Sequence, residues 1–417
     1  MAIRLRRWLA VGAALWSGAA SAQPVEHLER VVIVMRHGVR SAMSSPEELG
    51  EYSARPWPRF AVPAGHLTDD GARAVTLLGD WYRRHYRAVG LLADGDCAVY
   101  YWANHTQRTE ATATALARGL TPNCPATIHQ SPAAPDPLFD APMTPLARLD
   151  PARRLAAISG RIGGDLAGWD RRQQPGLDRF EAILLQCERV PCTPAERRRP
   201  RRRLADTPIR MALDSDGDVT LTSPALQVAG IAESLLMAYA DGLAFKGWRG
   251  IDAKSIEAAM TVHGAGIDLR TRTQEVGRQA SGYLATRILA TLQSGNGRGV
   301  AAEPIGGTEK IVVLSGHDGT VTMLAGLLGL EWQVPGYAAG QAAPGGGLVF
   351  ERWRRASGEA IVRVRYIAQG LDQLRALTPL TGDAVPGNAA VFVPGCSEAD
   401  MACPLEDFGR RVMEAQR

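Results

Sequence analysis

Lysine is rare in this chain of 417 residues, and arginine supplies almost all of its positive charge. Only Lys246, Lys254 and Lys310 occur. Removing residues 1–22 takes away three arginines and no acidic residue, so the formal net charge falls from +4 to +1. A near-neutral balance argues against a protein that holds nucleic acid by bulk charge. We therefore expect no nucleic-acid partner.

Long apolar runs are also lacking. Beyond the N-terminal segment, no stretch approaches the roughly 20 apolar residues that a membrane helix needs. In that segment, three arginines precede a short and mostly apolar stretch, Trp8–Ala19, and small residues follow at Ala20 and Ala22. This order predicts a secretory signal peptide over residues 1–22 and a periplasmic or secreted protein without a membrane segment. A retained N-terminal anchor is the alternative.

Metal-binding patterns are missing as well. No Cys-x-x-Cys pair occurs and the eight histidines do not cluster, which argues against a zinc site, and we expect neither a metal nor a cofactor. The six cysteines instead suggest disulfides in an exported chain. Their spacing favours the pairs Cys97–Cys124, Cys187–Cys192 and Cys396–Cys403. Six cysteines allow 15 pairings, so the spacing leaves the connectivity open.

Two charged segments have both a functional and a plain interpretation. The basic run Arg197–Arg203 suggests either a patch for an anionic partner or a solvated loop, and the general preference for arginine over lysine favours the loop. The segment Asp214–Asp218 superficially resembles a calcium loop, but it lacks the glutamate of an EF-hand and therefore predicts a turn.

The most informative segment, Met35–Arg40, follows the apolar run Val31–Val34. The order places a histidine at the carboxyl end of a buried strand, where open α/β sheets bind ligands. Two guanidinium groups, Arg36 and Arg40, beside the imidazole of His37 suit a phosphoryl group: the arginines hold its oxygens and the ring nitrogen attacks phosphorus. The alternative is a strand end that carries basic residues into solvent.

A second segment repeats this arrangement. The apolar run Ile311–Ser315 is followed by Gly316, His317 and Asp318, and a helix is expected from Gly319 to Leu330. The amide groups of that helix would face the same site. His317 adds a phosphate contact, and Asp318 adds a carboxylic acid that can protonate a leaving oxygen. Asp318 could instead serve only as the N-cap of the helix.

The pattern along the chain predicts an α/β fold interrupted by a helical insertion. Motif-bearing strands are apolar on both faces, as in buried parallel sheets. Strands are expected at Val31–Met35, Ala98–Trp102, Ile311–Ser315, Leu348–Arg352 and Ile361–Tyr366, the last two as an antiparallel pair. Helices are expected at Asp69–Arg87, Thr109–Arg118, Ser223–Asp241, Gln274–Gln293 and Thr320–Leu328. Residues 147–265 show helical patterning and few strands, so the α/β part must combine segments 23–146 and 266–417.

These motifs resemble those of the histidine acid phosphatases, which include phytases and bacterial glucose-1-phosphatase. Further stretches with the same resemblance are Gly65–Gly71, Gln107–Thr112, Thr273–Arg278 and Pro344–Trp353. The resemblance implies a phosphoglycerate-mutase-like α/β domain with a mixed, mostly parallel sheet and an inserted, smaller, mainly helical domain. It also supports the three disulfide pairs named above.

The resemblance, together with the chemistry of the two motifs, implies a double-displacement hydrolysis of phosphate monoesters. His37 forms a phosphohistidine, Arg36, Arg40, Arg108 and His317 bind the phosphoryl oxygens, and Asp318 donates a proton to the leaving alkoxide. Adjacent arginines disfavour the imidazolium form of His37.

The resemblance also places Glu233 and His263 at positions that line the substrate pocket, although a surface helix residue and a core histidine are the plain alternatives. Two competing functions are a phosphomutase and a phosphate-binding protein on the same fold. We expect a small-molecule substrate and a monomer.

The chain departs from the phytase pattern at the rim of the expected pocket. Many bacterial phytases have Arg-His-Gly-x-Arg-Ala-Pro-x-Lys, whereas here Ser44 stands at the position of the lysine. After the His-Asp pair, Gly319 and Thr320 replace the usual Thr-Asn or Ser-Asn. These changes leave the phosphoryl core intact and weaken the case for a dedicated phytase, so a broader acid phosphatase or a sugar-phosphate phosphatase is at least as plausible.

Overall fold

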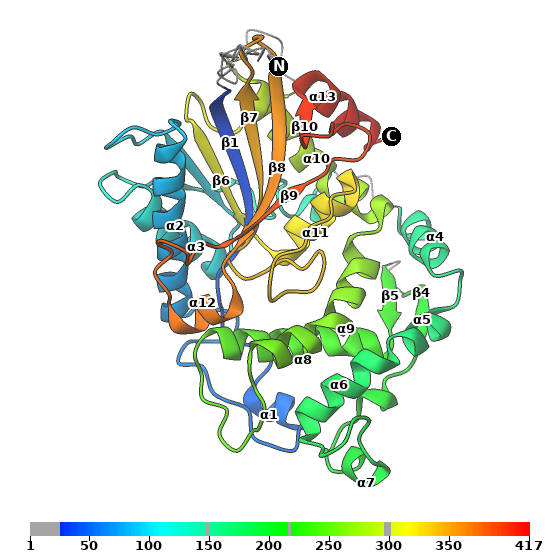
Figure 1. Cartoon of the computed structure of the whole chain (residues 1–417). Coiled ribbons are helices and arrows are strands. Elements are labelled where there is room, and N and C mark those ends of the chain that lie inside the picture. Colours follow the sequence, from blue (N-terminus) through cyan, green and yellow to red (C-terminus); the bar gives the residue numbers. More distant parts are fainter. Residues whose placement is uncertain (1–25, 147–149, 216–217, 296–301) are drawn as a thin grey trace, which may run out of the picture.

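A computed structural model describes residues 26–146, 150–215, 218–295 and 302–417. The expected signal peptide lies outside these residues. An α/β part and a mainly helical part make up the molecule, and in Figure 1 the sheet occupies the upper half. Within the described ranges, no helix combines the length and the apolar character that a membrane crossing requires.

The central sheet has the strand order β10-β8-β7-β1-β6-β2-β3, with β9 paired to the other part of β8. The strands span His27–Arg36 (β1), Val99–Ala103 (β2), Ile128–His129 (β3), Ile311–Gly316 (β6), Gly347–Arg354 (β7), Ala360–Ala368 (β8), Gly387–Val391 (β9) and Ala402–Pro404 (β10). All five expected strands are present, and the mixed α/β class is confirmed.

The expectation that parallel pairing predominates is wrong. Strands β1, β6, β2 and β3 pair in parallel, but β1–β7, β7–β8, β8–β9 and β8–β10 are antiparallel. Parallel neighbours need a crossover connection, usually a helix, whereas antiparallel neighbours can be joined by a short turn. Because β7 and β8 are separated by only a few turn residues, these two strands form a hairpin within the antiparallel half of the sheet.

Helices cover both faces of the sheet. Along β1, Val31, Ile33 and Met35 belong to one apolar cluster, whereas Val32 and Val34 belong to another. The first cluster includes residues of α2 (Asp69–Ala88) and α3 (Gln107–Leu120), and the second includes residues of α10 (Gln274–Gln293), α11 (Asp318–Leu328) and α13 (Leu405–Glu414). Burial of both faces explains why β1 and β6 read as continuous apolar runs.

The helical part lies at the carboxyl ends of β1 and β6 (Figure 1). Its helices are α1 (Pro46–Gly50), α4 (Pro151–Arg161), α5 (Leu166–Arg172), α6 (Gln174–Leu185), α7 (Pro194–Arg197), α8 (Pro224–Ala240) and α9 (Ala253–Thr271), and α12 (Leu371–Ala376) packs against α8. A small hairpin, β4 (Arg210–Leu213) and β5 (Val219–Thr222), is also present. The proposed boundary at residue 265 falls inside α9, so an inserted unit would have to end at one end of that helix.

Three disulfides join Cys97 to Cys124, Cys187 to Cys192 and Cys396 to Cys403, the pairs that the spacing favoured. In the basic run, Arg197 pairs with Asp178 and Glu181, and Arg203 pairs with Asp206. These contacts with the chain's own acids agree with the solvated-loop interpretation. Asp214 and Asp218 belong to the β4–β5 connection, where the amide of Asp214 donates to the Asp218 carbonyl at 2.9 Å.

Candidate active site

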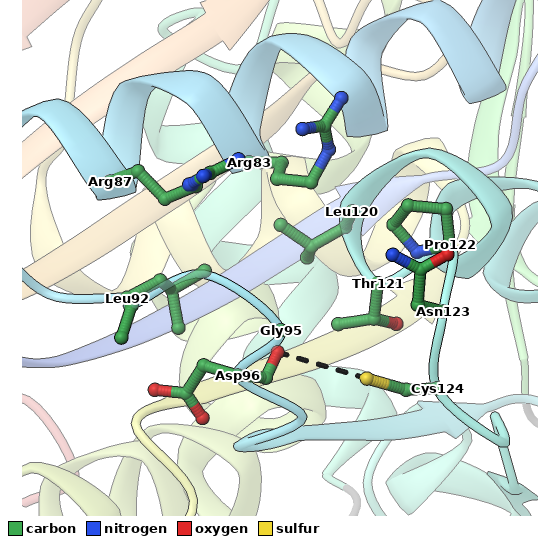
Figure 2. A pocket seen from close by; sticks show the side chains of 11 residues that line it. Arg83, Arg87, Leu92, Gly95, Asp96, Leu120, Thr121, Pro122, Asn123 and Cys124 are labelled. Atoms are coloured by element: carbon green, nitrogen blue, oxygen red, sulfur yellow. Dashed lines mark hydrogen bonds between the residues drawn. The ribbon is translucent and has the colours of Figure 1, made fainter.

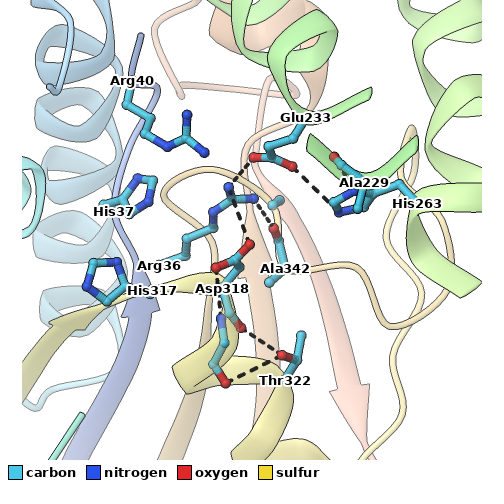
Figure 3. Close-up of polar contacts among 12 residues, drawn as sticks. Arg36, His37, Arg40, Ala229, Glu233, His263, His317, Asp318, Thr322 and Ala342 are labelled. Carbon is cyan, nitrogen blue, oxygen red and sulfur yellow. Dashed lines mark hydrogen bonds and ion pairs between the residues drawn. The ribbon is translucent and has the colours of Figure 1, made fainter. Parts of the chain in front are cut away.

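The two motifs meet at one edge of the sheet because their strands are parallel neighbours. Arg36 at the end of β1 lies opposite Gly316 at the end of β6, and the amide of His37 donates to the Gly316 carbonyl at 2.9 Å. The next residues, His37 and His317, therefore face each other with ring centroids 5.7 Å apart. Folding thus brings together two segments separated by most of the chain (Figure 3).

His37 is 2% exposed, and its Nδ1 lies 2.9 Å from the carbonyl of Gly38. A carbonyl only accepts hydrogen bonds, so Nδ1 carries the proton and Nε2 keeps its lone pair. Burial lowers the pKa of His37 well below its usual value, and the charges of Arg36 and Arg40 lower it further. The ring is therefore neutral, with the lone pair of Nε2 available. Gly38 is required beside it, because a Cβ there would lie 2.7 Å from Val75.

Arg36 is the buried cation at the centre of the site, 1% exposed. Its Nη1 donates to the Ala342 carbonyl at 2.7 Å, and its Nη2 pairs with Glu233 of α8 and lies 3.8 Å from Oδ2 of Asp318. On the far side of Glu233, Nε2 of His263 lies 3.6 Å from Oε2. Glu233 therefore contacts Arg36 directly, and His263 lies behind Glu233 (Figure 3).

His317 is held by a residue that the sequence reasoning missed. Asn104, directly after β2, places its Oδ1 3.2 Å from Nε2 of His317 and donates to Asp140 at 2.6 Å. Nη2 of Arg108, at the start of α3, lies 3.4 Å from Nδ1 of His317. Burial and the charge of Arg108 lower the pKa of His317 to about 4. The position of Asn104 at the end of a strand beside β6 was the available signal.

Asp318 is the first residue of α11 and is 37% exposed. Its Oδ1 accepts the amide of Gly319 at 2.9 Å. Burial alone would raise its pKa, but the charge of Arg36, the neighbouring His37 and this amide together hold the pKa below its ordinary value. The free carboxyl group is therefore ionised. In Figure 3, Arg36 lies between Asp318 and Glu233. The side chains of Arg40, His37 and His317 lie to the left of these three residues.

The remaining residues that the sequence predicted for the site differ in how deeply they are buried. Arg40 is buried and its Nη1 donates to the Ser41 carbonyl at 2.8 Å. Thr320 is buried too, and its hydroxyl accepts the amide of His317 at 3.1 Å, so it caps α11 and does not form a pocket rim. Gly319 is half-buried beside Asp318, and Ser44 is exposed in the loop after Arg40.

A hollow adjoins Arg36 and Asp318. Its other walls come from α9, α11 and the loop before β7: His263, Gly264, Ile267, Asp268, Arg272, Thr322, Ala339, Gly340, Gln341 and Ala342. A second hollow, beside the Cys97–Cys124 disulfide, includes Arg83 and Arg87 (Figure 2), but these arginines pair with Asp80 and Asp94. Among the described residues, no group of three or more His, Cys, Asp and Glu side chains could hold a metal ion.

The chain belongs to branch 2 of the histidine phosphatase superfamily, whose family model matches residues 27–204 and 257–367. Within it, the chain is a histidine acid phosphatase of the phytase and glucose-1-phosphatase type. It is 32% identical to phytase AppA of Escherichia coli (strain K12) over 96% of this chain and 94% of the relative. It is 24% identical to the glucose-1-phosphatase of Salmonella typhimurium over 95% of each chain.

Among solved structures, the Hafnia alvei phytase in complex with tartrate superposes with a TM-score of 0.83 and 30% identity, covering 94% of this chain and 98% of that one. The expected family and its phosphomonoesterase activity are confirmed.

Proposed function

We propose that this enzyme hydrolyses phosphate monoesters in two steps through a phosphohistidine on His37. The observation that carries this proposal is a neutral, buried imidazole beside cations with unused donors. Hydrogen bonding of Nδ1 to Gly38 leaves Nε2 to attack phosphorus. Meanwhile, the Nε atoms of Arg36 and Arg108 are buried without a hydrogen-bond partner. Buried donors are normally paired, so these donors favour an anion in the site.

In the first step, Nε2 of His37 forms a bond to phosphorus and the ester oxygen leaves. Arg36, Arg40 and Arg108 hold the phosphoryl oxygens as charge redistributes, and His317, whose Nδ1 lies 3.4 Å from Nη2 of Arg108, positions that guanidinium group. Several fixed cations thereby take the electrostatic role that metal ions have in other phosphoryl-transfer sites. In the second step, water attacks the phosphohistidine, and inorganic phosphate and free His37 result.

Asp318 supplies the proton for the departing alkoxide and then accepts one from the attacking water. An ionised carboxylate in the free enzyme is compatible with this role. Burial raises its pKa, but the charge of Arg36, the neighbouring His37 and the Gly319 amide together outweigh burial and keep the pKa low. A bound phosphate dianion neutralises Arg36 and adds negative charge nearby, and both effects raise the pKa of Asp318 in the complex.

The proton donor and the nucleophile together distinguish hydrolysis from simple phosphate binding, which needs neither group. A phosphomutase is less well supported, because the three disulfides fit an oxidising compartment and the mutase substrates are cytosolic sugar phosphates. We further propose a periplasmic or secreted monomer without a cofactor. Phytate, glucose-1-phosphate and simple alkyl and aryl phosphates are its candidate substrates.

The test is hydrolysis of p-nitrophenyl phosphate at pH 5 by the purified enzyme and by His37→Ala. We expect the variant to lose at least about a thousandfold in kcat, since it lacks the nucleophile. His129→Ala is the matched control, because this half-buried histidine lies on the edge strand β3 away from the site, and it should retain activity. Full activity in His37→Ala would eliminate the mechanism.

A further inference from the structure

The loop after the first motif is fastened to a second loop at the mouth of the site. Arg40 forms an isolated bridge with Leu67, and the amide of Ser41 donates to the His66 carbonyl at 2.9 Å. The hydroxyl of Ser41 also donates to the Pro63 carbonyl at 2.5 Å. These contacts fasten residues 40–44 to residues 63–67, and the two segments together are called the rim.

Met43 projects from this rim with 59% of its surface exposed. Its position is defined by Gly65, whose φ of +73° favours glycine. A Cβ at Gly65 would lie 2.8 Å from the Met43 sulfur and 3.7 Å from Nη1 of Arg108. The thioether of Met43 and the guanidinium group of Arg108 therefore lie on the same side of Gly65, each within 4 Å of where a Cβ would be. Because Arg108 also reaches His317, Met43 lies next to the phosphate-binding cations.

An exposed thioether beside a phosphate-binding cation is suited to an apolar ligand group. Water contact with apolar surface is unfavourable, and covering it contributes roughly 25 cal/mol per Å². Methionine is flexible and polarisable, so it adapts to groups of different shape, aromatic rings included. The same rim segment, residues 41–44, contains no cation that could bind additional phosphates.

We infer that Met43 is a specificity-determining residue that contacts the organic group of the ester, favouring monoesters of apolar alcohols over polyphosphorylated substrates. This inference rests on the proposed function, in which the phosphoryl group occupies the site between His37 and Arg108. The organic group then extends outward over the rim. Met43 covers it there, whereas a highly phosphorylated ring would bring further negative charge against an uncharged thioether.

The experiment compares two esters whose alcohols are both alkyl alcohols but differ in polarity: 2-phenylethyl phosphate and glycerol 2-phosphate. Met43→Ala should lower kcat/KM for 2-phenylethyl phosphate about tenfold relative to glycerol 2-phosphate, mainly through KM, as expected for a lost apolar contact. Met43→Lys should raise kcat/KM for myo-inositol hexakisphosphate at least fivefold relative to 2-phenylethyl phosphate, because the added cation pairs with peripheral phosphates.

Met413→Ala is the control, since Met413 is 47% exposed on α13 and should leave both ratios unchanged. Thermal melts of all variants show whether each one is folded. If the active wild-type enzyme and Met43→Ala have the same ratio for the two alkyl esters, the inference about Met43 is wrong while the proposed function stands. If the folded wild-type enzyme hydrolyses none of the esters, the proposed function itself is wrong.

Discussion

Replacing Asp318 by asparagine should separate proton donation from phosphate binding. The substitution keeps the shape of the side chain and an oxygen that can accept the amide of Gly319. Arg36 retains Glu233 as its ion-pair partner, so the buried cation is not left unpaired. Loss of a negative charge in the first turn of α11 costs only about 0.5 kcal/mol of stability. The variant should therefore fold, and its kinetics should report the missing acid.

In the proposed mechanism, the charge distribution predicts that Asp318 becomes an acid only in the substrate complex. Oδ2 lies 3.8 Å from Nη2 of Arg36. At an effective dielectric constant of about 20, two unit charges about 4 Å apart interact by about 4 kcal/mol, and solvent at this partly exposed carboxylate reduces that value. A phosphate dianion bound to Arg36 cancels the attraction that keeps the carboxyl group ionised. Protonation then becomes favourable at acidic pH.

General acid catalysis typically contributes a hundredfold to ten-thousandfold. We expect Asp318→Asn to lose about a thousandfold in kcat/KM on glycerol 2-phosphate, whose alkoxide needs a proton; kcat/KM reports the first step and excludes hydrolysis of the phosphohistidine. The loss on p-nitrophenyl phosphate should be less than about tenfold, because p-nitrophenolate leaves without one. The assay is a plot of log kcat/KM against the pKa of the leaving alcohol, which should be steeper for the variant.

Asp407→Asn provides the matched control for this experiment. Asp407 also lies in the first turn of a helix, α13, and is 36% exposed, close to the value for Asp318. It should leave the plot unchanged. Parallel plots for the wild-type enzyme and Asp318→Asn would refute the reasoning and remove Asp318 from the role of proton donor.

Three other predictions concern pH dependence and stability. Because the pKa of His37 is well below 6.5, kcat/KM for p-nitrophenyl phosphate should stay above half its maximum at pH 5, where an ordinary histidine would be almost fully protonated and inactive as a nucleophile. Glu233→Gln should lower the free energy of unfolding in urea by about 3 kcal/mol, because Arg36 loses its nearest buried counter-charge. Replacing Cys97 and Cys124 together by alanine should cost about 3.5 kcal/mol in the same assay, because a closed loop of 27 residues is released.

Each of these predictions has a contrary outcome. A tenfold fall in kcat/KM for each pH unit below 6.5 would mean that His37 titrates as an ordinary histidine. Glu47→Gln is the control for Glu233, because Glu47 forms an exposed ion pair with Arg59, and such pairs contribute 0–1 kcal/mol. Equal losses for the two glutamates would contradict a buried, dominant Arg36–Glu233 pair. Unchanged urea midpoints for the double cysteine variant would mean that this disulfide does not constrain the unfolded chain.

The sequence predicted the position of the site well because each of its two motifs directly follows a strand that is buried on both faces. The apolar runs before His37 and His317 mark strands buried on both faces, and their parallel pairing explains why the two histidines meet. Helix α10 has the expected bounds, Gln274–Gln293, and α11 begins at Asp318, one or two residues before the expected starts at Gly319 and Thr320. For both helices, the local sequence pattern is sufficient to predict the helix and its approximate bounds.

Features that depend on distant contacts were not predictable in the same way. The strands of the β4–β5 hairpin have only four residues each, and Leu221 is the one buried residue among them, so the pattern was too short to identify a strand. The sequence did predict the antiparallel β7–β8 pair, but the pairing of β7 with β1 joins strands far apart in the chain, and local sequence does not specify that. The Arg36–Glu233 pair and the support of His317 by Asn104 likewise join segments far apart in the chain.

The most direct test of the central claim is to identify the atom that receives the phosphoryl group. Radiolabelled p-nitrophenyl phosphate is mixed rapidly with enzyme, the reaction is quenched in alkali to preserve phosphohistidine, and the labelled peptide is sequenced by mass spectrometry. We predict up to one phosphoryl group per chain, on Nε2 of His37, and none in His37→Ala. Label on His317, or wild-type turnover with no labelled histidine at any quench time, would contradict the account.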